Sequence, residues 1–496
     1  MKISKYIWFL MAAMLFVSCS DWFDVTSGNE IREKDHYSTD TGYGQAVIGC
    51  YETMADISCY GLSLYDMPEI MVNGYRTVAE VMDAGYLQRH QFAQKGPKQK
   101  ILGLWNSSYN VIANANEALK NIEGAENRMN EINYHVFKGE LYAIRALAHF
   151  NLLRFFGYGN WAKRKAELDD KFTIPYVTVV NKDIQPQSTG AQVIANILKD
   201  LTEAELLLKD YDPVCGVHDA SYYKEVNEDG WYDYRNFHLN YYAVKALKAQ
   251  VYLWHGEIDK AEAEAMAVIN AIGKGKRLTL AKQPTFILKL MTVSEVNEPN
   301  YSMVNETLFG LSVHQLGMRV NSFFNPNYLD GASGVYLLKE EFAEELYNNS
   351  NTDFRFTKLL FHNISSTPTG YVPLKYYQSV GNNSYFTDKV NVIRLPEVYY
   401  IAAECHAEKG NAAEALRLLN AFRETRGLYE PLAGMTTEEI KTEIGKEYQR
   451  EFMGEGGAYF YFKRVGAENT PAKIGMTDAD YVLPYPDYEL QSGRVQ

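Results

Sequence analysis

The chain has 496 residues, of which 46% are hydrophobic, and a formal net charge of −13 at pH 7. This length is enough for two or three domains, or for one large helical assembly with a sizeable core. An acidic surface repels phosphate backbones, so the composition argues against a nucleic acid as partner. The 38 tyrosines exceed what the packing of a helical core requires, which indicates a surface that binds something.

The first 18 residues have the composition of a secretory signal. Two lysines precede an apolar run from Ile7 to Val17, which is too short to span a bilayer, since that takes roughly 20 residues. Ser18 and Cys19 follow, and a cysteine directly after a small residue is where bacterial lipoproteins are acylated. We therefore predict that residues 1–18 are removed and that Cys19 carries lipid, palmitate included, which anchors the chain without spanning the membrane. A plain secretory signal is the alternative.

Apolar residues recur at helical spacing in two neighbouring segments, residues 105 to 119 and residues 135 to 156. The stretch between them, at 124–130, is rich in Gly, Glu and Asn and breaks the pattern. The two segments therefore predict an antiparallel helical hairpin, with Trp105 and Tyr109 in its core.

Two later segments share the intervals of a tetratricopeptide helix pair. Small residues at these positions let two helices approach closely, and a glycine ends the first helix. The matching residues are Ala249, Gly256 and Ala261 in one segment and Ala403, Gly410 and Ala415 in the other. Because a long stretch of chain separates the two segments, we expect insertions to interrupt the helical units.

That separating stretch, residues 275–392, has the character of a loop-rich insertion. Alternation in Thr307 to Val313 predicts a short strand, and Leu338 to Tyr347 predicts a helix. Long irregular segments inside a compact protein are usually functional. We predict a mainly α fold, in which tetratricopeptide-like helical pairs form the scaffold of one compact unit. Its parts are the signal at 1–18, an N-terminal helical part at 19–274, the variable insertion with short strands at 275–392 and a C-terminal helical part at 393–496.

No catalytic motif stands in the sequence. It contains no His-Glu-x-x-His, no Walker loop and no Gly-x-Ser-x-Gly, so we expect a protein that is not an enzyme. Besides Cys19, the cysteines lack the spacing of a zinc site, and we interpret them as small buried hydrophobes.

One acidic stretch resembles the start of a calcium loop, with oxygen ligands at alternate positions. The candidate ligands are Glu225, Asn227, Asp229 and Asp233. Asn236 stands where such a loop has its bidentate glutamate, so a plain acidic turn is the alternative. No other cofactor is predicted.

Motifs spread over nearly the whole mature chain carry a family resemblance through their order and spacing. In chain order they are Gly139 to Gly157, Ala246 to Gly256, Asp353-Phe354-Arg355, Lys375-Tyr376, Arg394 to Glu404, Asn420, Arg423 to Gly427, Glu447, Glu451, Glu455-Gly456, Lys463-Arg464, Leu483 to Pro486 and Glu489. Together they resemble the SusD/RagB outer-membrane nutrient-binding lipoproteins of the Bacteroidetes. Where relatives usually carry Arg, Arg and Asp, this chain has Tyr448, Ala458 and Tyr461, and we expect aromatic packing to replace an ionic network there.

The resemblance implies a lipoprotein on the outer membrane, facing the cell exterior, that sits over a SusC-like TonB-dependent transporter barrel. Such a protein captures an oligomeric nutrient and hands it to the barrel. Aromatic loops suit sugar rings, whose C–H faces are apolar, so we expect an oligosaccharide ligand. A peptide-binding lipoprotein of the same fold is one alternative, and a surface glycoside hydrolase is another.

We expect the ligand to be held by loops between residues 60 and 90 and between residues 320 and 390, the regions that the resemblance favours. The candidate contacts are Tyr65, Tyr75, Arg76, Phe323, Phe324 and Tyr328. A turn signal, Asn73-Gly74, precedes Tyr75 and Arg76 and predicts that both are exposed. The loop from Tyr222 to Tyr234 is the alternative location.

Overall fold

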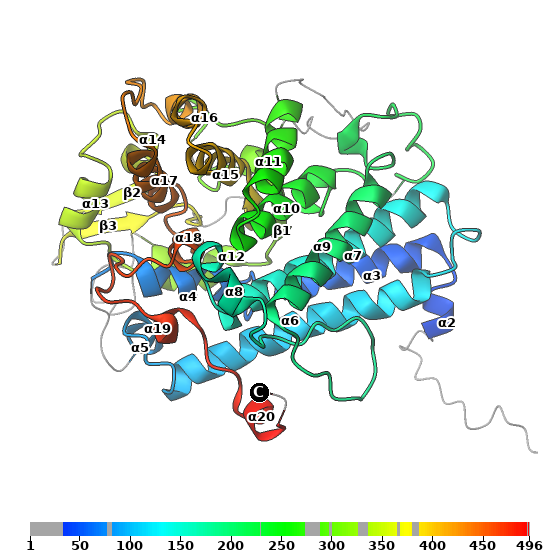
Figure 1. The fold of residues 1–496 in the computed structure, drawn as a ribbon. Helices are drawn as coiled ribbons and strands as arrows, with labels where there is room; N and C mark the ends of the chain where they lie inside the picture. The colour runs from blue at the N-terminus through cyan, green and yellow to red at the C-terminus, as the bar shows by residue number, and fades with distance from the viewer. Residues whose placement is uncertain are drawn as a thin grey trace, which may run out of the picture.

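The computed structural model describes residues 33–76, 82–228, 230–272, 288–296, 300–325, 336–364, 368–378, 386–493 and 495. Cys19 and Tyr328 lie outside these residues, as does Asp229. The described chain is mainly helical, with a few short strands (Figure 1). No helix in this part of the chain is long and apolar enough to cross a membrane.

The N-terminal half contributes the longest helices. In order they are α2 (Glu33–His36), α3 (Asp40–Met54), α4 (Ser63–Val72), α5 (Asp83–Gln88), α6 (Lys95–Ile122), α7 (Glu131–Phe156), α8 (Trp161–Leu168) and α9 (Gly190–Leu208), followed by the short η3 (Pro213–Cys215) and η4 (Arg235–Phe237). The predicted hairpin is confirmed, because α6 and α7 pack against each other, and α9 covers α7. Trp105 is buried and its ring meets Phe156 edge to face at 4.8 Å, while Tyr109 is partly buried.

The two tetratricopeptide-like pairs are also confirmed. They are α10 (Tyr241–His255) with α11 (Ile258–Ile272), and α15 (Leu395–Glu408) with α16 (Ala412–Thr425). The four alanines at the tetratricopeptide-like positions are fully buried, namely Ala249, Ala261, Ala403 and Ala415. Gly256 and Gly410 turn the chain at φ of +81° and +78°, a conformation in which glycine lacks the strain of a Cβ. Because α11 packs directly on α15, the two pairs form one continuous stack and the insertion loops out of it.

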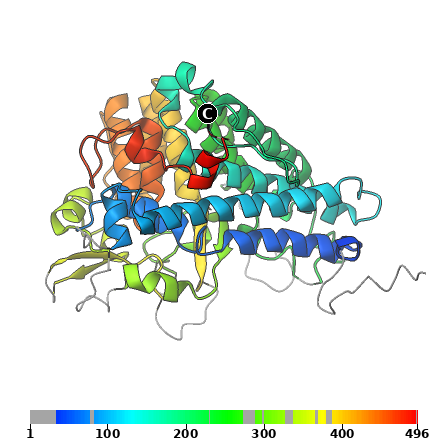
Figure 2. The ribbon, with the colours of Figure 1, turned by 90° about the horizontal axis from the view of Figure 1, so that it is seen from below.

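The insertion is closed at its base by a pair of strands, β1 (Thr307–Ser312) and β4 (Lys389–Arg394), which run antiparallel with Gly310 opposite Asn391. A second antiparallel pair joins β2 (Leu360–Asn363) to β3 (Gly370–Pro373). The remaining elements are η5 (Val304–Glu306), α12 (Leu316–Phe324), α13 (Glu340–Leu346) and α14 (Phe354–Thr357). Figure 2 shows the strands and α12 beneath the layer of helices. The predicted strand and helix of the insertion are therefore present.

The C-terminal part consists of α17 (Thr437–Glu451), α18 (Gly457–Val465), α19 (Asp478–Tyr481) and α20 (Asp487–Gln491). It returns to the N-terminal half, because α18 packs on α4. The rings of Tyr448 and Tyr461 stack at 4.7 Å and 24°, so aromatic packing occupies these positions as predicted.

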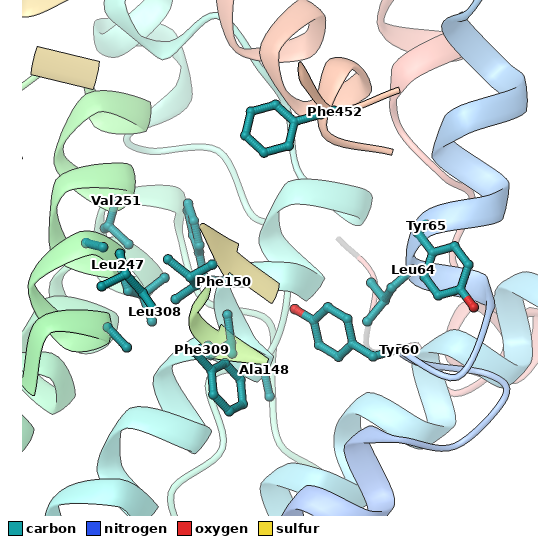
Figure 3. Close-up of a cluster of buried hydrophobic side chains, with 14 of the residues drawn as sticks. Tyr60, Leu64, Tyr65, Ala148, Phe150, Leu247, Val251, Leu308, Phe309 and Phe452 are labelled. Carbon is teal, nitrogen blue, oxygen red and sulfur yellow. The ribbon is translucent and has the colours of Figure 1, made fainter. Parts of the chain in front are cut away.

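Side chains from distant segments meet in one large core, and a second, smaller cluster of buried side chains lies around Met291 and Phe354. Figure 3 shows Phe150 of α7, Leu247 of α10 and Phe309 of β1 gathered in one part of the large core. The prediction for the cysteines is confirmed as well, since Cys50, Cys59, Cys215 and Cys405 are free and buried.

Candidate functional site

Several predicted ligand contacts come together around one tyrosine that the sequence predictions missed, Tyr336. Its ring lies 5.0 Å from Phe323, 5.4 Å from Tyr75 and 5.5 Å from Phe324, between ring centroids. Tyr75 comes from the N-terminal half, whereas the other three belong to the insertion. The structure thus joins the two predicted regions in one aromatic cluster.

The expected exposure of these rings is wrong for three of the candidates. Tyr65, Tyr75 and Phe324 are each no more than 2% exposed. The hydroxyl of Tyr75 donates to Glu69 Oε1 at 2.7 Å, and the ring of Tyr65 packs on Tyr376 at 5.0 Å. These three side chains therefore build the floor of the site and do not offer a stacking face to a ligand.

Two candidates reach the surface, Arg76 and Phe323, which are both half-buried. The backbone N–H of Arg76 donates to Leu337 O at 2.7 Å, and its Nε donates to Thr369 O, also at 2.7 Å. Both bonds go to the insertion: the first ties the backbone of Arg76 to it, and the second holds the guanidinium there.

A lysine of α6 fixes the other side of the aromatic cluster. Lys100 lies over the ring of Phe323 with its Nζ 5.9 Å from the centroid, and it also pairs with the fully buried Asp66 of α4. A cation held over an aromatic ring is attracted by the ring's negative face. The ring of Phe323 is therefore positioned from both α6 and Tyr336, which leaves it little freedom to move.

The alternative location, the loop from Tyr222 to Tyr234, is packed mainly into the core. Tyr223 and Tyr232 are fully buried, and the hydroxyl of Tyr232 donates to Asn133 Oδ1 at 2.7 Å. Tyr222 is 36% exposed and its ring stacks on His218 at 3.8 Å. Trp231 and Tyr234 are half-buried, so this loop brings one exposed and two half-buried rings to the surface.

The same loop uses two of its candidate calcium ligands to hold itself together. Asn227 Nδ2 donates to Asp233 Oδ1 at 3.1 Å, and the backbone N–H of Tyr232 donates to Asn227 Oδ1 at 2.7 Å. Among the residues that the structure describes, no three His, Cys, Asp or Glu side chains are grouped as a metal site would require. These contacts are those of an acidic turn.

The motifs that carry the family resemblance meet in a buried ionic network between the insertion and the C-terminal helices. Its carboxylates are Glu306, Asp353, Glu447, Glu451 and Glu455, and its cations are Arg355, Arg394, Arg426, Arg450 and Lys375. Burial alone would raise the pKa of Glu447, but Arg355 and Arg450 outweigh it and lower that pKa to about 2. Glu447 therefore stays charged, and the ion pairs of the network connect the insertion to the C-terminal helices.

Two family models match the chain. One, described as starch-binding associating with outer membrane, covers residues 23–215, and the other, described as the SusD family, covers residues 314–492. SusD-like protein P2 of Formosa agariphila is 24% identical over 547 residues, which span 98% of this chain and 97% of that protein.

Solved structures show the same fold. A SusD superfamily protein from Bacteroides thetaiotaomicron matches with a TM-score of 0.70 and 22% identity, over 92% of this chain and 99% of the other. A laminarin-binding SusD-like protein matches with a TM-score of 0.61 and 20% identity, over 93% of this chain and 99% of the other.

Proposed function

This chain belongs to the SusD/RagB family, and we propose that it is a cell-surface lipoprotein that binds an oligosaccharide and delivers it to a SusC-like TonB-dependent transporter in the outer membrane. The family is one of carbohydrate-binding, outer-membrane-associated proteins. The observation that carries the proposal to this chain is the aromatic cluster around Tyr336, which brings the half-buried ring of Phe323 together with Tyr75 from the other predicted region, while Arg76 is bound to the insertion through Thr369. We propose Arg76 and Phe323, together with Tyr328, as ligand contacts.

The chemistry of the two described contacts suits a sugar. A half-buried aromatic ring presents a face to the apolar C–H side of a pyranose, and a guanidinium donates to its hydroxyls in a fixed fork. Because Tyr336 and Lys100 hold Phe323, and Thr369 holds the guanidinium of Arg76, little side-chain freedom is lost when a ligand binds. We further propose that residues 19–274, 275–392 and 393–496 act as one unit in binding.

A double variant tests the binding site directly. Replacing Arg76 and Phe323 by alanine should weaken binding by roughly 50- to 100-fold, since a stacked ring contributes about 1 kcal/mol and a charged hydrogen bond about 1.5 kcal/mol. The measurement is calorimetry on the mature chain with laminari-, malto-, xylo-, cello- and mannohexaose. The matched control is Tyr429→Ala, which removes a ring that is 69% exposed. Affinity that is unchanged in the double variant would contradict the site.

The same panel separates the alternatives. A glycoside hydrolase would release reducing ends in excess of the protein, whereas a binder leaves the hexasaccharides intact. If the protein binds members of a random peptide library and binds none of the hexasaccharides, the peptide-binding alternative is favoured and the proposed ligand class is contradicted.

The anchor has its own test in Cys19→Ala. Without the thiol no acyl chain is attached, so the variant should leave the outer-membrane fraction and appear in the soluble fractions, as seen by immunoblotting after cell fractionation. A Cys59→Ala variant is the control, because Cys59 is buried in the fold and has no part in anchoring. If the Cys19 variant stays with the membrane as firmly as the wild type, the lipid anchor is wrong.

A further inference from the structure

A hollow lies on the surface between the start of α6 and the C-terminal segment around α20. Its volume is about 920 Å³, at the upper end of the range for small-molecule sites. It is lined by residues 90–102 of one segment and by residues 479–491 of the other. We call it the α6–α20 groove. A hollow of this size accommodates several sugar rings.

The groove combines aromatic rings with amides. Phe92 is buried in its wall, Tyr485 is half-buried, and Tyr488 is 41% exposed. Four glutamines surround these rings with exposed side chains, namely Gln91, Gln94, Gln99 and Gln491. Apolar rings and amides that both donate and accept are the two kinds of group that a pyranose needs.

The aromatic wall is held rigidly. The ring of Tyr485 meets Trp105 edge to face at 5.5 Å, and the hydroxyl of Tyr488 donates to Asn106 Oδ1 at 2.9 Å. Both contacts go to α6, which forms the opposite wall. The two sides of the groove are therefore fixed relative to each other before a ligand arrives, and this lowers the cost of binding.

The charges in the groove favour an uncharged ligand. Lys98 and Asp487 line it and pair with each other at 2.7 Å. His90 also lines it, and burial lowers the pKa of that ring to about 4, so the imidazole is neutral at physiological pH. One cation and one anion that satisfy each other leave little attraction for a phosphate, a uronic acid or a charged peptide.

The groove lies on a different side of α6 from the cluster around Tyr336. Successive helical residues are about 100° apart, so Lys98 and Leu102 share one face of α6 while Lys100 points to the opposite face. Lys98 and Leu102 line the groove, whereas Lys100 lies over Phe323. A ligand at one location therefore does not occupy the other.

We propose that the α6–α20 groove is a second saccharide site, which takes two or three uncharged pyranose units of the captured glycan. The inference rests on the proposed function, because it assumes that the ligand is a glycan. Two sites on opposite sides of one helix would let a long polymer be held at two points, which raises its residence time beyond what either site provides alone.

The experiment counts binding sites on the full mature chain with the same five hexasaccharides. Ala93→Trp fills the groove from an exposed alanine in its lining, and Tyr488→Ala removes its exposed ring. For the tightest hexasaccharide we expect two equivalents on the wild type and one on Ala93→Trp, with about fivefold weaker binding at the groove in Tyr488→Ala. Tyr429→Ala again serves as the control and should keep both equivalents.

The outcomes separate this inference from the proposed function. If the Arg76→Ala, Phe323→Ala variant still binds one equivalent of hexasaccharide, and adding Ala93→Trp abolishes it, both proposed sites are supported. If the wild type binds a single equivalent and only the Arg76 and Phe323 substitutions abolish it, the proposal of a groove site is overturned and the proposed function stands. Normal binding in the groove variants with lost copurification of a barrel transporter also overturns the groove site, since the groove would then contact a protein. Binding of no hexasaccharide overturns both.

Discussion

Replacing Glu451 by glutamine should lower the free energy of unfolding by roughly 3 to 5 kcal/mol, because it leaves buried cations without their counter-charge. Glu451 is fully buried and accepts hydrogen bonds from Arg394 at 2.8 Å, from Arg426 at 3.0 Å and from Arg355 at 3.3 Å. Burial acts to raise the pKa of this carboxyl, but Arg426 and Arg394 outweigh it, and the pKa lies well below its usual range. The glutamine side chain fills the same space but carries no charge.

Urea unfolding followed by tryptophan fluorescence measures the loss, and Glu414→Gln is the matched control. Glu414 makes an ion pair of similar length with Arg417, at 2.6 Å, but Arg417 is largely exposed in this pair, with 57% of its side chain accessible. Surface pairs contribute at most about 1 kcal/mol, so the control should change little. Equal effects of the two substitutions would mean that the buried network does not stabilise the fold.

The network also shows why the sequence predicted the family but not the role of its motifs. Order and spacing identify Arg355, Arg394 and Arg426 as family-like residues, yet nothing local to any of them predicts that they share Glu451 or Glu306. Their burial depends on contacts between η5, α14, β4, α17 and the end of α16. Such contacts are fixed by the whole fold.

Predictions from local sequence patterns were right where contacts within one or two helices determine the structure. Apolar periodicity predicted α6 and α7, and small residues at fixed intervals predicted the two helix pairs, because both patterns act within one or two helices. The turn signal at Asn73-Gly74 was misleading for Tyr75. Its chain segment forms a bridge with Leu338 and its ring packs on Tyr336, so distant partners bury what the local sequence would expose.

At the candidate site, too, local sequence predicted the regions involved, but contacts with distant residues determine which side chains are accessible. Aromatic clustering in the sequence pointed to two regions, and the structure joins them at Tyr336, but only Arg76 and Phe323 stay accessible among the described candidates. The α6–α20 groove escaped prediction because its aromatics are few and lie far apart along the chain. Phe92 and Tyr488 become neighbours of one hollow only after α20 returns to α6.

A second large effect should appear on acidification, centred on His149. This ring is fully buried in α7, stacks on Tyr176 at 3.8 Å, and accepts from the backbone N–H of Val177 at 3.0 Å through Nε2. Its Nδ1 lies 2.9 Å from Arg145 O, so Nδ1 carries the proton of the neutral ring and donates it there. Burial lowers the pKa of His149 from 6.5 to about 3.

The direction of the effect follows from proton binding. Between pH 6.5 and about 3 the unfolded chain binds a proton at His149 that the folded chain does not, so acidification favours unfolding in this window. Each pKa unit corresponds to about 1.4 kcal/mol, and the full shift is therefore worth roughly 5 kcal/mol, present above pH 6.5 and lost by about pH 3. Glu140 and Glu447, with pKa lowered to about 2, lose their contributions at lower pH, from about 4.5 down to 2.

Urea unfolding between pH 4.5 and 6.5 isolates the histidine from those carboxylates. His149→Gln cannot gain the proton, so the free energy of unfolding of this variant should rise less steeply with pH than that of the wild type, by up to about 1.4 kcal/mol per pH unit. The variant should be the less stable protein at pH 6.5 and approach the wild type at pH 4.5. His314→Gln, at an exposed position of the insertion, controls for the loss of a histidine as such. Parallel pH dependences for the wild type and His149→Gln would show that the buried ring is protonated as easily as in the unfolded chain, contrary to its contacts with Val177 and Arg145.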